Sequence, residues 1–172
     1  RNEIYSDYKG NRSDAPDDLI PQFEYIRKSV LAFNLPSIEL LNYEADDLIA
    51  TYSEQILKLG GKVTIVSSDK DLMQLYKKNI RIYDPMKNKF VNEEDIKNKF
   101  GVGAEKVIDV QSLAGDSSDN VPGVPGIGVK TAAELITNFG TLENLLKNAS
   151  QIKQNKRSCL LYTSPSPRDQ LQ

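Results

Sequence analysis

The sequence predicts an α/β fold followed by a helical subdomain, and three observations support this. A β-branched run at residues 62–68 lies between two helical patterns, which is how a strand is placed in an α/β layer. Two short extended runs follow it, separated by turn residues. Beyond residue 92 the apolar residues recur only at helical spacing. Strands and helices therefore alternate early in the chain, and helices dominate late.

Two helices are expected in the first part of the chain. N-cap candidates at residues 17–18 precede apolar residues that recur at helical spacing as far as residue 34. A short extended run at 37–41 follows. The second helix opens at residues 43–47 and stops at the glycine pair 60–61, because glycine tolerates the left-handed conformation that closes many helices.

The middle of the chain predicts a small sheet. The run at 62–68 is rich in β-branched residues and bounded by Gly and Asp, which is typical of a buried parallel strand. A short helix is expected at 69–76, and the runs 81–83 and 90–91 predict a hairpin. The later helical patterns cover residues 93–100 and 104–114, and one more follows a glycine-rich turn.

The composition limits the chemistry that the chain can perform. Lys and Arg number 22 against 24 Asp and Glu, so the net charge of −2 creates no general basic field for a polyanion. There is no His and no Trp, and the one Cys is Cys159. These absences exclude His-dependent nucleophiles, zinc fingers and disulfide frameworks. Any metal must accept oxygen ligands, as Mg²⁺ and Mn²⁺ do.

The ends of the sequence carry no targeting segment. Neither a run of about 20 apolar residues nor a secretory signal is present, so we expect a cytoplasmic protein without a membrane partner. The chain starts at Arg1 within a polar stretch, which suggests truncation. Residues 159–169 resemble one frame of a transposase-derived sequencing adapter, so we expect 159–172 to be non-native; the alternative is a genuine disordered tail.

Three acidic clusters lie at the ends of predicted elements. Each has a structural alternative, because Asp and Glu cap helices and Asp–Ser–Asn sequences form turns. Ligands of an open α/β sheet gather outside the carboxyl ends of the strands, where the second cluster must lie. Converging carboxylates repel one another unless cations are bound, so the set predicts a site for two divalent ions. Its members are Glu44, Asp46, Asp47, Asp69, Asp71, Asp116 and Asp119.

A glycine-rich turn at residues 122–132 precedes an amphipathic helix. Glycines allow a tight turn with exposed backbone N–H groups, and the helix N-terminus adds positive potential. This is typical of a helix-hairpin-helix element, which grips duplex DNA through its backbone. The alternative is a plain loop. The spacing is not that of a Walker A loop, so nucleotide triphosphate binding is not expected. The candidate DNA-binding residues are Gly126, Ile127, Gly128, Lys130 and Thr131.

Basic and aromatic residues alternate at the start of the chain. Arg1, Lys9 and Arg12 can meet phosphates, and Tyr8 can stack on an unpaired base. Local sequence alone does not separate this from a solvated polar segment with packed tyrosines.

Together these stretches resemble the 5′→3′ exonuclease domain of bacterial DNA polymerase I, a member of the flap endonuclease superfamily. The resemblance rests on residues 1–12, 43–48, 67–72 and 113–132, in order and at family-like spacing. It implies a PIN-like, flap-nuclease parallel sheet flanked by helices, here partial, and a helix–three-turn–helix subdomain. We expect a nuclease core with its arch segment at 1–103, a helical DNA-binding subdomain at 104–158 and the tail at 159–172.

The resemblance also implies roles for single residues. Glu44, Asp46 and Asp47 would belong mainly with one Mg²⁺ or Mn²⁺ ion, and the other four acidic residues mainly with a second. Lys9 and Arg12 would lie on the arch that passes the single strand and would polarise the scissile phosphate. The glycine turn would anchor the duplex and hold a K⁺ ion through its carbonyl groups.

The expected reaction of the intact parent is hydrolysis of DNA phosphodiesters in replication and repair, including removal of Okazaki primers. We expect a monomer acting on 5′ flaps, nicked or gapped duplexes and RNA primers. Family members begin with two strands that each carry a metal-binding Asp, so the present chain is expected to be inactive or nearly so. The alternatives are a non-catalytic duplex-binding module and a free-standing flap or RNase H-type nuclease.

Overall fold

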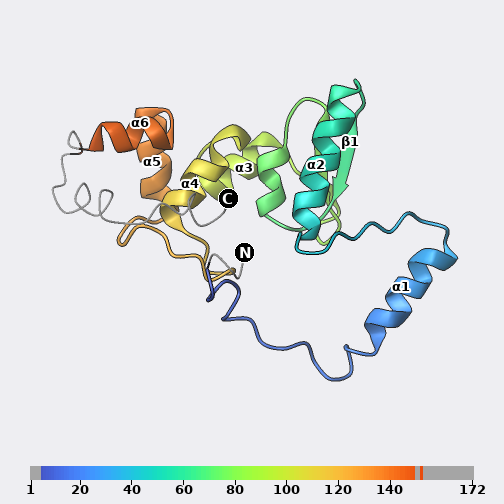
Figure 1. Ribbon diagram of the computed structural model, residues 1–172. Helices are drawn as coiled ribbons and strands as arrows, with labels where there is room; N and C mark the ends of the chain where they lie inside the picture. Colours follow the sequence, from blue (N-terminus) through green and yellow to red (C-terminus); the bar gives the residue numbers. More distant parts are fainter. Residues whose placement is uncertain (1–4, 150–151, 153–172) are drawn as a thin grey trace.

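A computed structural model of the chain describes residues 5–149 and residue 152. Its order of elements confirms an α/β part followed by helices (Figure 1). The strands are β1 (Val63–Val66), β2 (Ile80–Asp84) and β3 (Lys89–Phe90). The α-helices are α1 (Gln22–Ala32), α2 (Ala45–Lys58), α3 (Glu93–Phe100), α4 (Val107–Ala114), α5 (Val129–Phe139) and α6 (Leu142–Lys147). Two 3₁₀ helices, η1 (Asp71–Leu75) and η2 (Ala104–Lys106), lie between them.

The sheet is small and mixed, with the strand order β1-β2-β3. β1 runs parallel to β2, with Val63 opposite Ile80, and β2 runs antiparallel to β3, with Tyr83 opposite Phe90. The expected hairpin is therefore confirmed. The expectation that β1 is buried is wrong, because only Ile65 is buried while Val66 is 65% exposed. Within the described residues β1 pairs on one side only, so it is an edge strand with one covered face.

Local signals explain where the helices begin and end. The side chain of Asn92 accepts a hydrogen bond from the backbone N–H of Asp95, and the Asp95 carboxylate accepts one from the N–H of Asn92. This reciprocal pair fixes the start of α3, and Gly101 closes the helix at a φ of +76°. The pattern at 104–114 forms η2 and then α4, so its first turn is 3₁₀.

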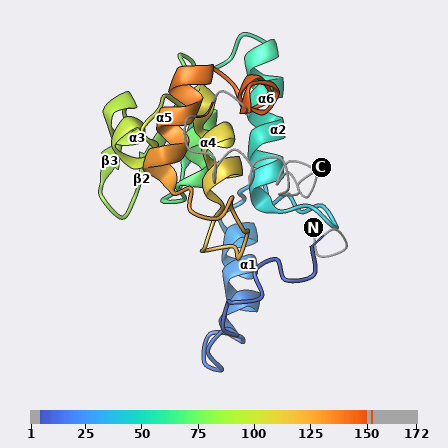
Figure 2. The same cartoon turned by 90° about the vertical axis from the view of Figure 1, so that its left-hand side faces the viewer.

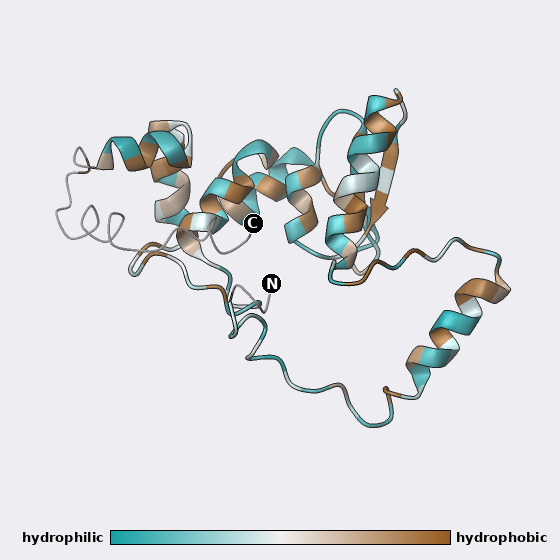
Figure 3. Cartoon of the chain, viewed as in Figure 1, coloured by the Kyte–Doolittle hydropathy of each residue, from teal (hydrophilic) through white to brown (hydrophobic). Residues whose placement is uncertain are grey.

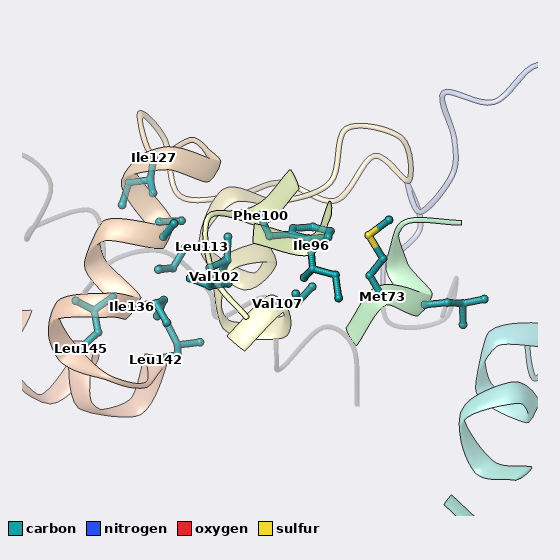
Figure 4. Close-up of a cluster of buried hydrophobic side chains, with 14 of the residues drawn as sticks. Met73, Ile96, Phe100, Val102, Val107, Leu113, Ile127, Ile136, Leu142 and Leu145 are labelled. Atoms are coloured by element: carbon teal, nitrogen blue, oxygen red, sulfur yellow. The ribbon is translucent and has the colours of Figure 1, made fainter. Parts of the chain in front are cut away.

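One hydrophobic core joins the sheet to the late helices (Figure 4). Ile82 from β2, Ile96 from α3, Leu113 from α4, Ile136 from α5 and Leu145 from α6 are each 0–1% exposed. Full burial of such side chains contributes about 1.5–3 kcal/mol each. The expected amphipathic helix after the glycine turn is confirmed, since Ile136 of α5 is fully buried.

The N-terminal part of the chain lies outside this core. α1 begins at Gln22, later than the N-cap candidates at 17–18, and none of its residues is buried. Apolar residues of its helical pattern are exposed, with Phe23 at 45% and Leu31 at 68%. Residues 37–41 form no strand. Both views show α1 apart from the body of the molecule, and brown and teal residues are both present on it (Figures 1, 2 and 3).

Candidate metal and phosphate site

Six of the seven acidic residues predicted as metal ligands line a single cavity of about 300 Å³. The cavity lies between the start of α2, η1, α4 and the loop at 115–121, which we call the acidic loop. Asp69 is the predicted ligand that does not line it. The acidic residues that do are Glu44, Asp46, Asp47, Asp71, Asp116 and Asp119.

The first acidic cluster also caps α2. Glu44 is the N-cap residue, and its backbone N–H donates to Oδ2 of Asp47 at 2.9 Å. A carboxylate in the first turn is favoured by the helix dipole. The capping role considered from the sequence is thus present for Asp47, and the same residue faces the cavity. Capping and ligand roles are compatible, because a carboxylate has two oxygens and about four lone-pair directions.

The second cluster follows β1, at the carboxyl end of the parallel pair. Oδ1 of Asp69 accepts the backbone N–H of Asp71 at 2.9 Å, which turns the chain into η1. Oδ1 of Asp71 accepts a hydrogen bond from Nε2 of Gln111 on α4 at 2.7 Å. Burial raises the pKa of Asp71, the nearby Asp116 and Asp69 charges add to this, and the Gln111 bond opposes it. A cation at this place would remove the repulsion that raises the pKa.

The third cluster lies on the acidic loop, which two glycines hold tightly closed. The backbone groups of Asp116 and Val121 exchange hydrogen bonds of 2.9 and 2.8 Å across it. At the neck of the loop Gly123 crosses the end of α4 so closely that a Cβ there would lie 2.3 Å from the carbonyl group of Ala114. A Cβ on Gly115 would meet the backbone of Gly123 at the same distance. Neither Gly115 nor Gly123 was assigned a role from the sequence, although Gly115 directly precedes Asp116 and Gly123 lies within the glycine-rich turn at 122–132.

Lys70 lies between Asp69 and Asp71 in the sequence, and its side chain reaches the acidic loop. Its Nζ lies 2.7 Å from Oδ2 of Asp116. That oxygen is buried and has no well-aligned hydrogen bond, so the contact is an ion pair without full hydrogen-bond geometry. Burial opposes the charge of Asp116, but the Lys70 ammonium and the backbone N–H of Ser118 hold the pKa of Asp116 below its usual value. A carboxylate oxygen whose hydrogen bonding is incomplete can serve as a ligand of a cation.

Lys9 and Arg12 bind the rim of the same acidic set. Nζ of Lys9 lies 2.7 Å from Oε1 of Glu44 and 3.8 Å from Oδ2 of Asp119. Arg12 pairs with the other oxygen of Asp119. The Tyr8 hydroxyl donates to Oδ2 of Asp119 at 3.1 Å and lies 3.3 Å from Oε2 of Glu44. Burial raises the pKa of Tyr8, as do the two carboxylate charges.

Several of the acidic side chains pair with basic groups instead of converging on one point in the cavity. In the part of the chain that is described, no three acidic side chains are already arranged around one metal position. Lys9, Arg12 and Lys70 instead balance Glu44, Asp116 and Asp119. The all-oxygen donor set and the buried Asp116 oxygen nevertheless fit a hard divalent cation. Side-chain rotations within one cavity would be needed to form the ligand sphere.

Asp84 is a buried acidic residue next to the site that the sequence analysis missed. It ends β2, is 3% exposed, and accepts the Ser68 hydroxyl at 2.7 Å. Lys87 lies 3.0 Å away and the backbone N–H of Met86 also donates to it. These bonds, that of Ser68 first, lower the pKa of Asp84 to about 2. Because Ser68 directly precedes Asp69, this hydrogen bond links the turn that carries Asp69 to the end of β2. A single Asp before Pro is an ordinary turn signal, so the sequence did not indicate the hydrogen bond between Ser68 and Asp84.

The glycine turn has the backbone that the sequence predicted. Gly126 adopts a φ of +77°, and Gly128 is the N-cap residue of α5. Ile127 is 4% exposed, and its backbone N–H donates to the carbonyl oxygen of Val124 at 3.0 Å, so the residue shapes the turn from inside. Lys130 is exposed in the first turn of α5, and Thr131 is half-buried. Arg1, the remaining candidate DNA-binding residue, lies outside the described residues.

Comparison with known proteins identifies the family. Residues 1–101 match the family model "5′-3′ exonuclease, N-terminal resolvase-like domain", and residues 102–164 match "5′-3′ exonuclease, C-terminal SAM fold". The chain belongs to the 5′-3′ exonuclease family. The two matches together confirm the predicted fold class, an α/β part followed by a helical subdomain.

Two curated relatives show how much of a whole protein is present. The chain is 55% identical over 157 residues to DNA polymerase I of Rhizobium leguminosarum, covering 91% of the chain and 16% of the relative. It is 43% identical over 148 residues to the 5′-3′ exonuclease of Aquifex aeolicus, covering 86% of the chain and 51% of the relative. The chain thus spans about a sixth and about half of these two proteins.

Solved structures of a nuclease from bacteriophage T5 share the fold of this chain. A T5 5′-exonuclease with bound zinc ions has a TM-score of 0.83 at 24% identity, covering 99% of this chain and 66% of that one. A T5 flap endonuclease variant with DNA and metal ions has a TM-score of 0.77 at 25% identity, covering 99% and 67%. Structural relatives of this chain therefore bind divalent metal ions, and one is bound to DNA. No helix in the described part of the chain is long and apolar enough to cross a membrane.

Proposed function

We propose that this chain supplies the metal-binding and DNA-binding surfaces of a 5′-3′ exonuclease or flap endonuclease that hydrolyses DNA phosphodiesters. The observation that carries the proposal is the gathering of six acidic side chains around one cavity, with Lys9 and Arg12 bound to two of them. Carboxylates from three distant segments repel one another where they meet, and only three basic side chains in the described part of the chain pair with the six that line this cavity. Family membership supports the same chemistry.

Each group of residues has a distinct task in this proposal. Glu44, Asp46 and Asp47 hold one Mg²⁺ or Mn²⁺ ion, and Asp69, Asp71, Asp116 and Asp119 hold a second. When bound, two such ions lower the pKa of water and stabilise the leaving oxygen of a phosphodiester. Asp69 reaches the set by rotation from its present place outside the cavity. Gln111 orients Asp71 through its 2.7 Å hydrogen bond.

Lys9 and Arg12 bind the scissile phosphate in this proposal. Both are charged and partly exposed, and both already lie against carboxylates of the cavity. Where a bound divalent ion would balance Glu44 and Asp119, Lys9 and Arg12 would be free to turn toward an incoming phosphate. Burial opposes the charge of Lys9, but Glu44 and the Tyr8 hydroxyl raise its pKa, so the ammonium stays protonated at neutral pH. No residue is required as a general base.

The glycine turn holds the duplex. The backbone of the turn at 126–128 and the side chains of Lys130 and Thr131 contact phosphates, and a K⁺ ion binds carbonyl groups of the turn. Such contacts fix position without selecting a sequence. We propose a nuclease part at 1–103, a DNA-binding part at 104–158, and a monomer that acts on 5′ flaps, nicked or gapped duplexes and RNA primers.

Metal binding by the chain itself is the first test. Mn²⁺ is titrated while free ion is followed by electron paramagnetic resonance, for the wild type and for Asp71→Asn with Asp116→Asn. We expect the double variant to bind Mn²⁺ at least about tenfold more weakly, because two oxygen ligands are lost. Glu54→Gln is the matched control, since Glu54 is an exposed residue of α2 that pairs with Lys77 away from the cavity. Equal binding by all three proteins would contradict the proposal.

Cleavage of a labelled 5′-flap oligonucleotide with Mg²⁺ is the second test. It is measured for the chain alone and for the Rhizobium leguminosarum polymerase in which this chain replaces the matching segment. Asp71→Asn with Asp116→Asn should lower the rate of the grafted enzyme by about a hundredfold or more. Weak cleavage by the isolated chain remains a prediction that the same assay checks. Tight duplex binding without Mn²⁺ binding would favour the non-catalytic module.

A further inference from the structure

The segment that carries Lys9 and Arg12 is fastened to the acidic loop by bonds that involve no charged side chain. The backbone N–H of Lys9 donates to the carbonyl oxygen of Asp119 at 2.8 Å. Nδ2 of Asn120 donates to the carbonyl oxygen of Asp7 at 2.7 Å, and Nδ2 of Asn11 donates to the carbonyl oxygen of Ser117 at 2.8 Å. We call these three bonds the asparagine clasp. Figure 1 shows the two segments side by side below α4.

The clasp crosses between the two segments in both directions. Asn11 reaches from the basic segment to the loop, and Asn120 reaches from the loop to the basic segment. A side-chain amide bonded to a backbone carbonyl positions the main chain whatever the charge state of its neighbours. The clasp therefore does not depend on the ion pairs of Lys9 and Arg12, which a divalent ion at the acidic residues would break.

Two residues of the clasp region have unusual backbone conformations. Lys9 has a φ of +56° and Asn120 a φ of +58°. Asn tolerates the left-handed region, but a Lys there is uncommon and strained. Such strain persists only where surrounding bonds hold it, and it concentrates at functional sites. At Lys9 the holding bonds are its N–H to Asp119 and its carbonyl oxygen, which accepts the N–H of Arg12 at 3.1 Å.

We propose that Asn11 and Asn120 are positioning residues that keep Lys9 and Arg12 beside the acidic loop when the ion pairs are broken. The proposal rests on the proposed function, since it assigns the two basic groups to the scissile phosphate. It adds how these groups stay in place. The clasp holds the main chain at Lys9 and Arg12 fixed while their side chains turn from the carboxylates to the phosphate. Neither asparagine needs to touch the substrate.

Hydrogen exchange of the isolated chain tests the clasp without any activity. In Asn120→Gly the backbone keeps its left-handed conformation at no steric cost, and only the side-chain donor is lost. We expect the Lys9 amide to exchange at least about fivefold faster in Asn120→Gly and in Asn11→Ala, because the segment opens more often. Asn34→Gly is the matched control: Asn34 also has a positive φ, of +53°, and lies at the end of α1. Unchanged exchange in both clasp variants would overturn the proposal.

Kinetics of the grafted polymerase separate positioning from a merely structural role. Each clasp variant should lower kcat on the flap substrate by about tenfold with KM changed less than twofold, since misplaced groups lose transition-state contacts. In a Lys9→Ala, Arg12→Ala background the same substitutions should cost less than about twofold more, because they act through those residues. The unfolding midpoint of each variant is measured alongside.

The outcomes separate this proposal from the proposed function. A wild-type graft that does not cleave would contradict the proposed function, while the exchange experiment would still decide the clasp. Additive losses in the double-background cycle, or a fall in kcat that tracks the unfolding midpoint, would assign the asparagines a structural role and overturn the positioning proposal. Non-additive losses with an unchanged midpoint support it.

Discussion

The residues from β1 to α6 and the residues before α2 are two different kinds of structure in one chain. The first set buries Ile80, Ile96, Val107 and Ile136 almost completely. Along the described chain before α2 no residue is buried at all. The proposed chemistry lies where the two meet, because Lys9 and Arg12 come from the unburied part and Asp71 and Asp116 from the packed part. Folding stability therefore comes from the packed part, whereas the two basic groups proposed to bind the scissile phosphate come from the unburied part.

α1 shows what this difference means physically. It is 11 residues long and is held by its own backbone bonds and an ion pair between Glu24 and Lys28. Isolated helices shorter than about 12–15 residues are marginal in water. Its apolar residues repeat at helical spacing, so the sequence predicts a helix, but helical spacing does not tell what covers the apolar side.

Core truncation should give the largest contrast between the two regions. Ile136→Ala leaves a cavity among α4, α5 and α6 and is expected to lower the free energy of unfolding by about 2–5 kcal/mol. Ile26→Ala is the matched control on α1, where the side chain is 54% exposed, and should change it by less than about 0.5 kcal/mol. Urea unfolding followed by circular dichroism measures both. An equal fall in the free energy of unfolding for both variants would mean that α1 is as well packed as the core, and the contrast between the two regions would not hold.

The closure of the acidic loop should be nearly as sensitive, although it lies at the border of the packed region. Gly123→Ala places a methyl group 2.3 Å from the backbone of Ala114. Backbone cannot rotate away as a side chain can, so we expect a loss of about 1–3 kcal/mol and weaker Mn²⁺ binding as Asp116 and Asp119 move. Urea unfolding and the Mn²⁺ titration test this. A normal metal affinity in Gly123→Ala would show that the loop reaches its ligand positions without the close crossing.

Local patterns predicted most of the packed region. The β-branched run, the turn residues and the helical spacing identified β1, the hairpin and α3, because each signal lies within or next to the element that it shapes. The carboxyl-end rule predicted that Asp71 would lie near other acidic residues, and it shares a cavity with Asp116. Their ligand roles remain predictions.

Long-range contacts could not be predicted from the sequence. Gln111 bonds to Asp71 from 40 residues away, and a lone Gln on a helix carries no signal of its partner. Lys70 lies between two Asp residues, and spacing alone does not reveal that it points to Asp116. The burial of β1 was wrongly predicted because strand composition does not show on which side a neighbour lies.

Acid should weaken the packed region through Asp84. Its pKa is about 2 in the folded protein, below the ordinary aspartate value of 3.8, so its ionised form stabilises the fold. This contribution is complete above about pH 4 and is lost as the pH falls through 4 toward 2. Asp84→Asn should therefore lower the unfolding midpoint in urea at pH 6, and the difference from wild type should shrink between pH 4 and 2. A difference that is constant with pH would mean that the charge of Asp84 is not what stabilises the turn before Asp69.

Loss of one proposed phosphate contact from the glycine turn should have the smallest effect. It should change the affinity for DNA and leave the free energy of unfolding almost unchanged. Lys130→Ala removes an exposed ammonium in the first turn of α5, so the unfolding free energy should change by less than about 0.5 kcal/mol. Affinity for a duplex oligonucleotide should fall uniformly across sequences, and the slope of log K against log salt should become shallower by about 0.9. Lys147→Ala on α6 is the control, because Lys147 is also exposed but lies outside the turn. If both variants change the salt slope equally, general positive charge rather than the turn holds the duplex, and α6 would have to be counted as part of the DNA-binding surface.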